Sequence, residues 1–237
     1  MSNFPYRKPP HGLLLWILML VLTAPALAQN EFDFTPVDYK VIAKNIADPD
    51  SRYYYPPLMQ RYRNNDTTLT ASDYRHLYLG YTFQPTYKPY GKASQTEDIN
   101  ELIAKENKTA ADFEKLRQLS MEVLQDYPFD IKAIYNMGVT EDELGNKAAA
   151  AKWFFKFEKI LTTILDTGDG LSKPTAWHVI TVADEYVLLS IVGLPFGGEQ
   201  QLIDHYDYLK LADNEYGIEG VYFDISRMLA SLEEDTK

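Results

Sequence analysis

The sequence predicts a mainly α protein of the α+β class, in which antiparallel helical hairpins are followed by an antiparallel β-hairpin. Two observations lead to this class. Residues 95–194 carry apolar side chains at the three- and four-residue spacing of amphipathic helices. After Pro195, in residues 195–237, apolar and polar residues alternate instead, which is typical of strands. At this length and composition we expect one compact domain over residues 29–237.

The first 28 residues have the three parts of a secretory signal peptide. A charged start is followed by ten apolar residues, Leu13–Leu22, and by small residues at Ala26 and Ala28. This apolar run is shorter than the about 20 residues that cross a bilayer. We therefore predict cleavage after Ala28 and a secreted or periplasmic protein with no stable membrane span. An uncleaved anchor is the alternative.

The predicted mature chain is strongly acidic. The sequence holds 23 Lys and Arg against 34 Asp and Glu, and loss of Arg7 and Lys8 with the signal peptide leaves 21 against 34, a net charge of −13. Such a charge opposes binding to the phosphates of nucleic acid or to an anionic membrane surface, so we expect neither as a partner. The chain has no Cys and therefore no disulfide.

Residues 29–94 form a block that is rich in Tyr and Arg. Between Ser51 and Lys92 it holds six basic residues against two acidic ones, although the protein as a whole is acidic. Short helices are predicted over residues 57–63 and 71–79. The second helix has Thr70 as its N-cap, with Asp73 completing a capping box.

This block supplies the first candidate binding site. Tyr and Arg are frequent in interfaces because each combines contact area with a polar tip. The candidate contacts are Arg61, Tyr74, Arg75 and Tyr78, and the partner would be a protein, a peptide or a glycan. The alternative is that tyrosines at this density fill the core of a small helical block while their hydroxyl groups reach water.

Three further helices are predicted from apolar spacing and capping residues. They cover residues 109–127, 130–144 and 148–166. Thr109 and Asp112 can form a capping box, and Gly145 allows a left-handed turn between the last two helices. Gly138 and the alanines at 148–151 indicate that these two antiparallel helices approach closely.

The order of residues in this helical hairpin resembles a tetratricopeptide repeat. The matching residues are Tyr135-Asn136-Met137-Gly138 in the first helix, Gly145-Asn146 in the turn, and Ala150 and Phe154 in the second helix. Glu141 and Phe157 depart from the repeat pattern, which indicates a divergent unit. The resemblance covers about residues 97–166 and is specific only at this one unit.

The resemblance implies a concave, peptide-binding face along the first helix of the hairpin. The residues of this chain that match that face are Lys132, Tyr135, Val139 and Asp142. A groove of this kind normally needs several stacked repeats. The alternative is therefore that these residues pack against flanking segments or face solvent.

Residues 175–193 are predicted to form a central helix, because the segment is apolar almost all round. Its polar exceptions, Thr175, His178, Thr181 and Glu185, fall on one stripe at helical spacing. A His and a carboxylate in such a stripe could bind a metal or transfer protons, so His178 and Glu185 are the candidates for a hydrolase. The alternative is a stripe of hydrogen-bonded or solvent-facing groups.

No motif assigns a catalytic residue, a metal ligand or a cofactor. The chain lacks HExxH, GxSxG and a phosphate-binding loop, and it has no Cys nucleophile. The run DTGDG at residues 166–170 begins like a calcium loop, but its twelfth position is Trp177 where a Glu is needed. We therefore expect no cofactor and no metal, and we favour a non-enzymatic protein.

The alternating segment after Pro195 predicts two strands joined by the turn-rich linker ADNEYG. The residues expected on one side of each strand are His205, Asp207 and Leu209 in the first and Val221, Phe223 and Ile225 in the second. A two-stranded ribbon is marginally stable alone, so one of its faces must pack on the helices or pair with another chain.

Several segments together resemble an uncharacterised secreted bacterial family, domain of unknown function 4919. They are YPPLMQRYR, DTTLTASDYRHLYLGY, AWHVITVADEYVLL and NEYGIEGVYFDIS, in addition to the signal peptide. The resemblance implies an envelope or extracellular location but carries no activity. Two hypotheses follow. One is a non-catalytic interaction or binding module of the bacterial envelope, and the other is a hydrolase acting on envelope or dietary polymers.

Overall fold

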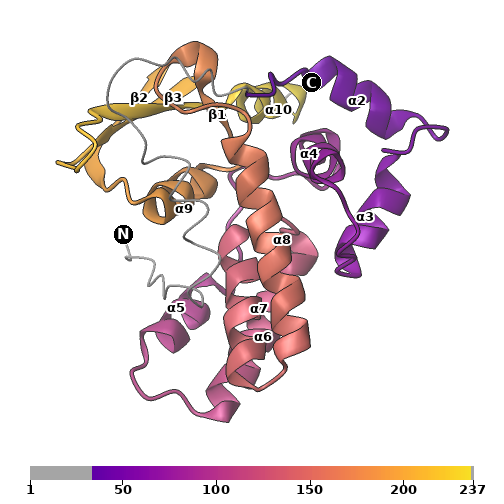
Figure 1. The fold of residues 1–237 in the computed structure, drawn as a ribbon, viewed down its shortest axis with the longest axis vertical. Helices are drawn as coiled ribbons and strands as arrows, with labels where there is room; N and C mark the ends of the chain where they lie inside the picture. Colours follow the sequence, from indigo (N-terminus) through magenta and orange to yellow (C-terminus); the bar gives the residue numbers. More distant parts are fainter. Residues whose placement is uncertain (1–33, 236–237) are drawn as a thin grey trace, which may run out of the picture.

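The computed structural model describes residues 34–235 and confirms the α+β class (Figure 1). This part of the chain holds nine α-helices and one four-stranded sheet near the C-terminal end. The predicted signal peptide, residues 1–28, lies outside the described residues. Within residues 34–235, no helix has the length and apolar character that a membrane span requires.

The Tyr/Arg block folds into short helices. They are α2 (Tyr39–Ala47), α3 (Tyr55–Arg63), α4 (Ala71–Gly80) and the 3-10 turn η1 (Tyr81–Phe83). Both predicted helices are present, and α3 begins two residues early because prolines fit its first turn. Thr70 and Asp73 form the predicted capping box. Helix α2, which we did not predict, begins where the Asp38 carboxylate accepts two backbone N–H groups.

Four helices form the middle part of the chain. They are α5 (Thr96–Ala104), α6 (Ala110–Asp126), α7 (Ile131–Glu143) and α8 (Lys147–Leu165). Helices α6, α7 and α8 lie side by side along the long axis of the molecule (Figure 1). The predicted box of Thr109 and Asp112 caps α6, and Gly145, with a φ of 83°, makes the turn between α7 and α8.

The predicted helix 175–193 is wrong in its first half. The chain forms the 3-10 turn η2 (Lys173–Thr175), then the short strand β1 (Trp177–His178), and only then helix α9 (Val182–Val192). Thr181 is the N-cap of α9, so the four polar residues do not share a helical stripe. An apolar run cannot by itself distinguish a buried strand from a buried helix, and β1 exists because it pairs in parallel with a distant strand.

The sheet contains the predicted hairpin and two strands that were not predicted. The other strands are β2 (Phe196–Ile203), β3 (Tyr206–Leu211) and β4 (Gly220–Asp224), and the order is β1-β4-β3-β2. Strands β3 and β4 pair antiparallel, with Asp207, Leu209, Val221 and Phe223 buried as expected. Helix α10 (Ser226–Asp235) follows β4 directly, so Ile225 lies just outside the strand and His205 just before β3.

One large hydrophobic cluster joins the parts of the molecule. It runs from Ile42 in α2 through the tyrosines of α3 and α4, the inner sides of α7, α8 and α9, and the inner face of the sheet to Met228. A smaller cluster lies between α5, α6 and α7. The larger cluster therefore contains described residues from each of the three predicted segments, 29–94, 95–194 and 195–237.

Candidate functional site

Two of the four candidate residues in the Tyr/Arg block belong to the core. Tyr74 is 1% exposed and its ring meets Tyr62 edge-on, while Tyr78 is completely buried. The Tyr78 hydroxyl donates a hydrogen bond of 2.7 Å to Asp184 of α9. These two tyrosines hold α4 against neighbouring elements, and the Tyr78 hydroxyl is buried on Asp184 where the packing alternative expected hydroxyl groups that reach water.

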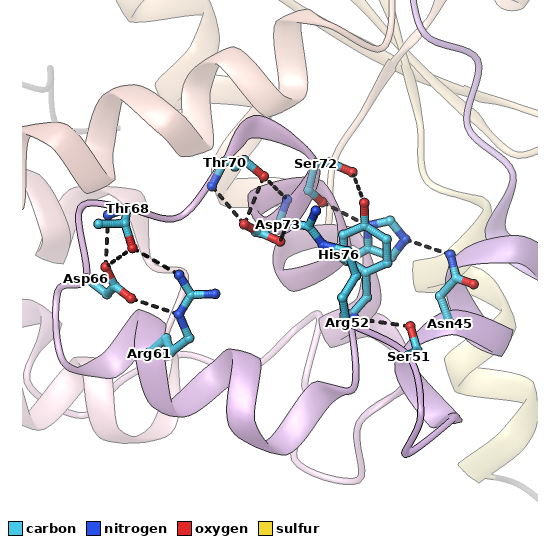
Figure 2. A network of polar contacts seen from close by, with 11 residues as sticks. Asn45, Ser51, Arg52, Arg61, Asp66, Thr68, Thr70, Ser72, Asp73 and His76 are labelled. Carbon is cyan, nitrogen blue, oxygen red and sulfur yellow. Dashed lines mark hydrogen bonds and ion pairs between the residues drawn. The ribbon is translucent and has the colours of Figure 1, made fainter.

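The two candidate arginines bind parts of their own chain. Arg61 donates through Nε to Asp66 at 2.8 Å and through Nη2 to Thr68 at 3.1 Å (Figure 2). Hydrogen bonds from Thr68, and then from Arg61, lower the pKa of the Asp66 carboxyl to about 2. Arg75 donates to the carbonyl oxygens of Thr35 and Pro36 at 2.7 and 2.8 Å. Both arginines therefore order adjacent chain segments.

A second polar network in this block centres on His76 (Figure 2). Its ring stacks on Tyr53 with a centroid separation of 3.7 Å and an interplanar angle of 3°. Nδ1 lies 2.8 Å from the carbonyl oxygen of Ser72, and Nε2 lies 3.0 Å from Nδ2 of Asn45. These contacts fit a neutral ring that donates from Nδ1 and accepts at Nε2. Burial correspondingly lowers the pKa of His76. This network ties α2 to α4.

The predicted peptide-binding face of α7 is largely occupied. Tyr135 is 5% exposed and contacts the rings of Phe154 and Phe157 in α8. Lys132 is exposed near the start of α7, and Asp142 forms an ion pair of 2.7 Å with Lys147 near its end. Tyr135 thus separates the two ends of the face by a packed aromatic contact.

An open groove lies instead on the opposite side of α7. Its volume is about 670 Å³, and it is bounded by α6, α7 and α8. The lining residues are Glu114, Lys115, Arg117, Gln118, Met121, Met137, Glu141 and Trp153. At 100° per residue, Met137 and Glu141 point away from the side of α7 that carries Tyr135. The volume falls within the range of small-molecule and cofactor sites.

The groove combines an apolar base with charged groups. Met137 and Trp153 are almost buried and form part of its wall, whereas Met121 is 42% exposed. Arg117 pairs with Glu114, and one of its nitrogens is 3.9 Å from Glu141. The sequence contained one sign of this site, because Met121 interrupts the polar face of α6. The groove is formed by three helices together, so the sequence of any one of them does not predict it.

Lys156 lies directly behind the Trp153 wall. It is 3% exposed, and its Nζ sits 4.1 Å from the ring centroid of Tyr62 and 4.5 Å from that of Trp153. No carboxylate contacts this ammonium group among the residues that the structure describes. Burial lowers the pKa of Lys156 to about 7, while the two rings favour its charged form through cation–π contact.

The two hydrolase candidates occupy different surroundings. His178 lies in β1 beside Asp224, with its Nδ1 at 3.8 Å from Oδ1 of Asp224 and at 3.3 Å from the hydroxyl of Tyr39. The other carboxylate oxygen of Asp224 is 3.7 Å from Nε2 of the exposed His205. Burial lowers the pKa of His178 even though Asp224 opposes this change. His178 is thus part of a contact between α2, β1 and β4.

Glu185 belongs to a buried carboxyl pair with Asp207 of β3. Glu185 is completely buried, and no hydrogen-bond donor reaches either of its oxygens among the described residues. Burial, followed by the nearby Asp207, raises the pKa of Glu185 to about 10. Glu185 is therefore protonated at neutral pH beside Asp207, which accepts a hydrogen bond from Gln200 at 2.9 Å.

Neither hydrolase candidate lines the groove, and Glu185 is closed to a substrate in this arrangement. Within the described part of the chain, no group of three or more His, Asp or Glu side chains is arranged to hold a metal ion.

A comparison with protein families places the chain in one of them. The family model described as Domain of unknown function (DUF4919) matches residues 40–234. The chain belongs to this family. The match extends from α2 to α10 and so includes the Tyr/Arg block, the helical hairpin and the sheet. Comparisons with curated proteins and with solved structures gave no match.

The DUF4919 family assignment confirms the resemblance seen in the sequence but supplies no chemistry. Its description names no activity, ligand or partner. The tetratricopeptide resemblance and the secretion signal stay predictions, since the match concerns the family as a whole. Any function assigned to this DUF4919 chain must therefore rest on its own surfaces.

Proposed function

We propose that this chain is a non-catalytic binding module of the bacterial envelope, and that the groove between α6, α7 and α8 holds a peptide segment of another protein. The observation that carries the proposal is the groove itself, in which Trp153 and Met121 lie beside Arg117. Trp, Met and Arg are the residue types enriched at the centres of protein interfaces.

The composition of the groove supports an occupant with one apolar side chain and one carboxylate. The apolar side chain would cover Met121 and reach the edge of Trp153, which removes an exposed hydrophobic surface from water. The carboxylate would bind Arg117 or Lys115. The Arg117 guanidinium has five N–H donors, so it can pair with a second carboxylate while it still contacts Glu114.

The location in the envelope rests on the predicted signal peptide. Its cleavage would leave a chain that begins at Gln29. The mass of the mature protein recovered from the periplasm or the medium tests this part. A mass that includes residues 1–28 would contradict secretion by cleavage.

The hydrolase hypothesis has weaker support. Its candidates would need a cleft that joins them, yet Glu185 is completely buried and His178 packs against Tyr39. A buried acid can act as a general acid only where a substrate reaches it. The binding hypothesis depends on a surface that is already open.

Peptide selection tests the groove directly. The chain is immobilised and used to select from a random peptide library, and the affinity of an enriched peptide is then measured for variants. We expect Met121→Glu and Arg117→Ala each to weaken binding by roughly 30-fold, the loss typical of a hot-spot contact. Arg63→Ala removes an exposed arginine outside the groove and is the matched control.

Two results would contradict the proposal. One is a selection that enriches no peptide, and the other is a peptide that binds both groove variants as tightly as the original chain. Met121 and Arg117 are partly exposed, so their substitution should leave the fold intact, and circular dichroism checks this.

A further inference from the structure

The outer face of the sheet carries a row of tyrosines. In β3, Tyr206, Tyr208 and Lys210 alternate with buried residues, and Tyr222 does the same in β4. Because side chains alternate across a strand, these four residues share the face that points away from the core. All three tyrosines are partly exposed, so the face is aromatic and open to solvent.

The rings are held in defined positions. Tyr208 and Tyr222 are cross-strand partners with a centroid separation of 4.8 Å. Tyr206 lies two residues before Tyr208 in β3, about 7 Å away along the strand, and its ring centroid is 4.1 Å from that of His205. Paired aromatic rings across two strands stabilise one another, which keeps their faces in place.

Gly220 makes room for one of these rings. A Cβ atom at this position would collide with the ring and hydroxyl of Tyr208. The Tyr208 side chain therefore lies over Gly220 of β4, which has no side chain to block it. A glycine in a strand weakens it, and a close approach of another group explains its presence here.

The charged groups around the tyrosines are already paired. Lys210 contacts Glu199 of β2 at 2.7 Å, and Lys173 contacts Asp204 at 2.7 Å. Lys173 also lies 5.7 Å from the ring centroid of Tyr206. These four charges cancel, and the exposed carboxylate of Glu219 beside Tyr208 and Lys210 adds a negative charge that disfavours an anionic ligand. Their remaining donor and acceptor capacity matches hydroxyl groups, which both donate and accept.

We infer that this tyrosine face binds a neutral polysaccharide. One side of a sugar ring is a sheet of C–H groups and packs on an aromatic ring, while the hydroxyl groups at its rim take hydrogen bonds. Partly exposed tyrosine rings spaced along β3 and β4 fit a chain of sugars, and the charged groups beside them lie where hydroxyl groups would reach. The site is on the sheet and shares no residue with the groove of α6 to α8.

Affinity electrophoresis tests the inference on the mature chain. Native gels contain amylopectin, galactomannan, xyloglucan or mixed-linkage β-glucan, and polygalacturonate serves as a charged control. We expect at least one neutral polysaccharide to retard the protein. Tyr222→Ala should weaken this binding by roughly tenfold or more, whereas Tyr222→Phe, which keeps the ring, should stay near the original affinity.

The matched control is Tyr90→Ala, because Tyr90 is half exposed and lies outside the sheet. It should bind as the original chain does. The Phe variant also covers the case in which Tyr222→Ala fails to fold, since it preserves the packing.

Four results would overturn the inference. They are no retardation by any neutral polysaccharide, retardation by polygalacturonate alone, a Phe variant as weak as the Ala variant, and an Ala variant that binds like the original chain. Sedimentation velocity tests whether a second copy of the chain occupies this face instead. A dimer that Tyr222→Ala dissociates would assign the face to that second copy.

Discussion

The ring of Phe154 lies directly against the Cα of Gly138, where α8 crosses α7. A Cβ atom added to Gly138 would stand 2.6 Å from Cε1 of Phe154, closer than two carbon atoms can approach. The small residue that the sequence places in this helix is thus required by the packing of one aromatic ring. Ala150 on α8 is likewise buried in the same hairpin.

Gly138→Ala should therefore destabilise the protein. Alanine favours a helix by about 1 kcal/mol over glycine, but displacement of the Phe154 ring costs about 1 to 3 kcal/mol, so the overpacking outweighs the propensity. Urea unfolding measures the difference. Gly145→Ala is a useful comparison. A Cβ atom added to Gly145 would meet no neighbouring atom within 4 Å, so the cost of this substitution comes from the positive φ alone. A Gly138→Ala variant more stable than the original would disprove the contact.

Two buried hydroxyl groups lie in α6 and α7, helices that pack against each other. Ser120 and Thr140 are both completely buried, and neither hydroxyl oxygen has a hydrogen-bond partner among the described residues. An unpaired buried hydroxyl costs free energy that an apolar group of the same shape does not.

We expect Thr140→Val and Ser120→Ala each to raise the free energy of unfolding by about 0.5 to 1.5 kcal/mol. Thr163→Val is the control, because that hydroxyl donates to the Lys159 carbonyl oxygen at 2.7 Å and its loss should not stabilise. Denaturant titration of the three variants separates these outcomes. Destabilisation by Thr140→Val would show that its hydroxyl has a partner, such as a bound water.

The carboxyl pair of Glu185 and Asp207 predicts an unusual pH dependence of stability. The pKa of Glu185 is raised in the folded state, so between about pH 4.5 and pH 10 the folded chain holds a proton that the unfolded chain has lost. The free energy of unfolding therefore falls as pH rises through this window. The buried Asp184, whose pKa burial raises to about 7, acts in the same direction up to neutral pH.

Glu185→Gln removes the contribution of Glu185 to this dependence, because an amide stays neutral throughout the pH window. We expect the variant to match the original chain at pH 4 and to exceed its stability by about 1 to 3 kcal/mol at pH 8. Thermal melts across pH 4 to 8 measure this. Glu106→Gln, at an exposed position, should leave the pH profile unchanged. Equal gains at pH 4 and pH 8 would rule out the titration of Glu185 as the cause.

How much of this molecule the sequence predicts depends on the range of the interactions. The capping boxes of Thr70 and Thr109 depend on residues three positions apart, and both form as expected. The buried side of the β3–β4 hairpin follows from its alternation. The same alternation already placed Tyr206 and Tyr208 on the opposite side, although no site was recognised there.

The wrong predictions concern segments whose structure depends on residues far away in the sequence. Trp177 and His178 form a strand because β4 lies beside them, and nothing in their own segment distinguishes that outcome from a helix. Strand β2 is exposed along most of its length and therefore shows no alternation at all. The composition of the Tyr/Arg block resembles that of an interface, yet Tyr74 packs against Phe155 of α8 and Tyr78 binds Asp184 of α9, both far away in the sequence.

Lys156 predicts a free energy of unfolding that rises with pH, whereas Glu185 predicts one that falls. Its pKa is lowered by burial, so between about pH 7 and pH 10.5 the unfolded chain binds a proton that the folded chain does not, and stability rises with pH in this window. Lys156→Met keeps the length of the side chain and removes the titration. The variant should be more stable than the original chain by at least about 1 kcal/mol at pH 7, with the difference shrinking towards pH 10.

The control is Lys152→Met, on the exposed side of the same helix, which should leave the stability unchanged at both pH values. A Lys156→Met variant that is less stable at pH 7 would mean that the cation–π contacts with Tyr62 and Trp153 outweigh the cost of burying the charge.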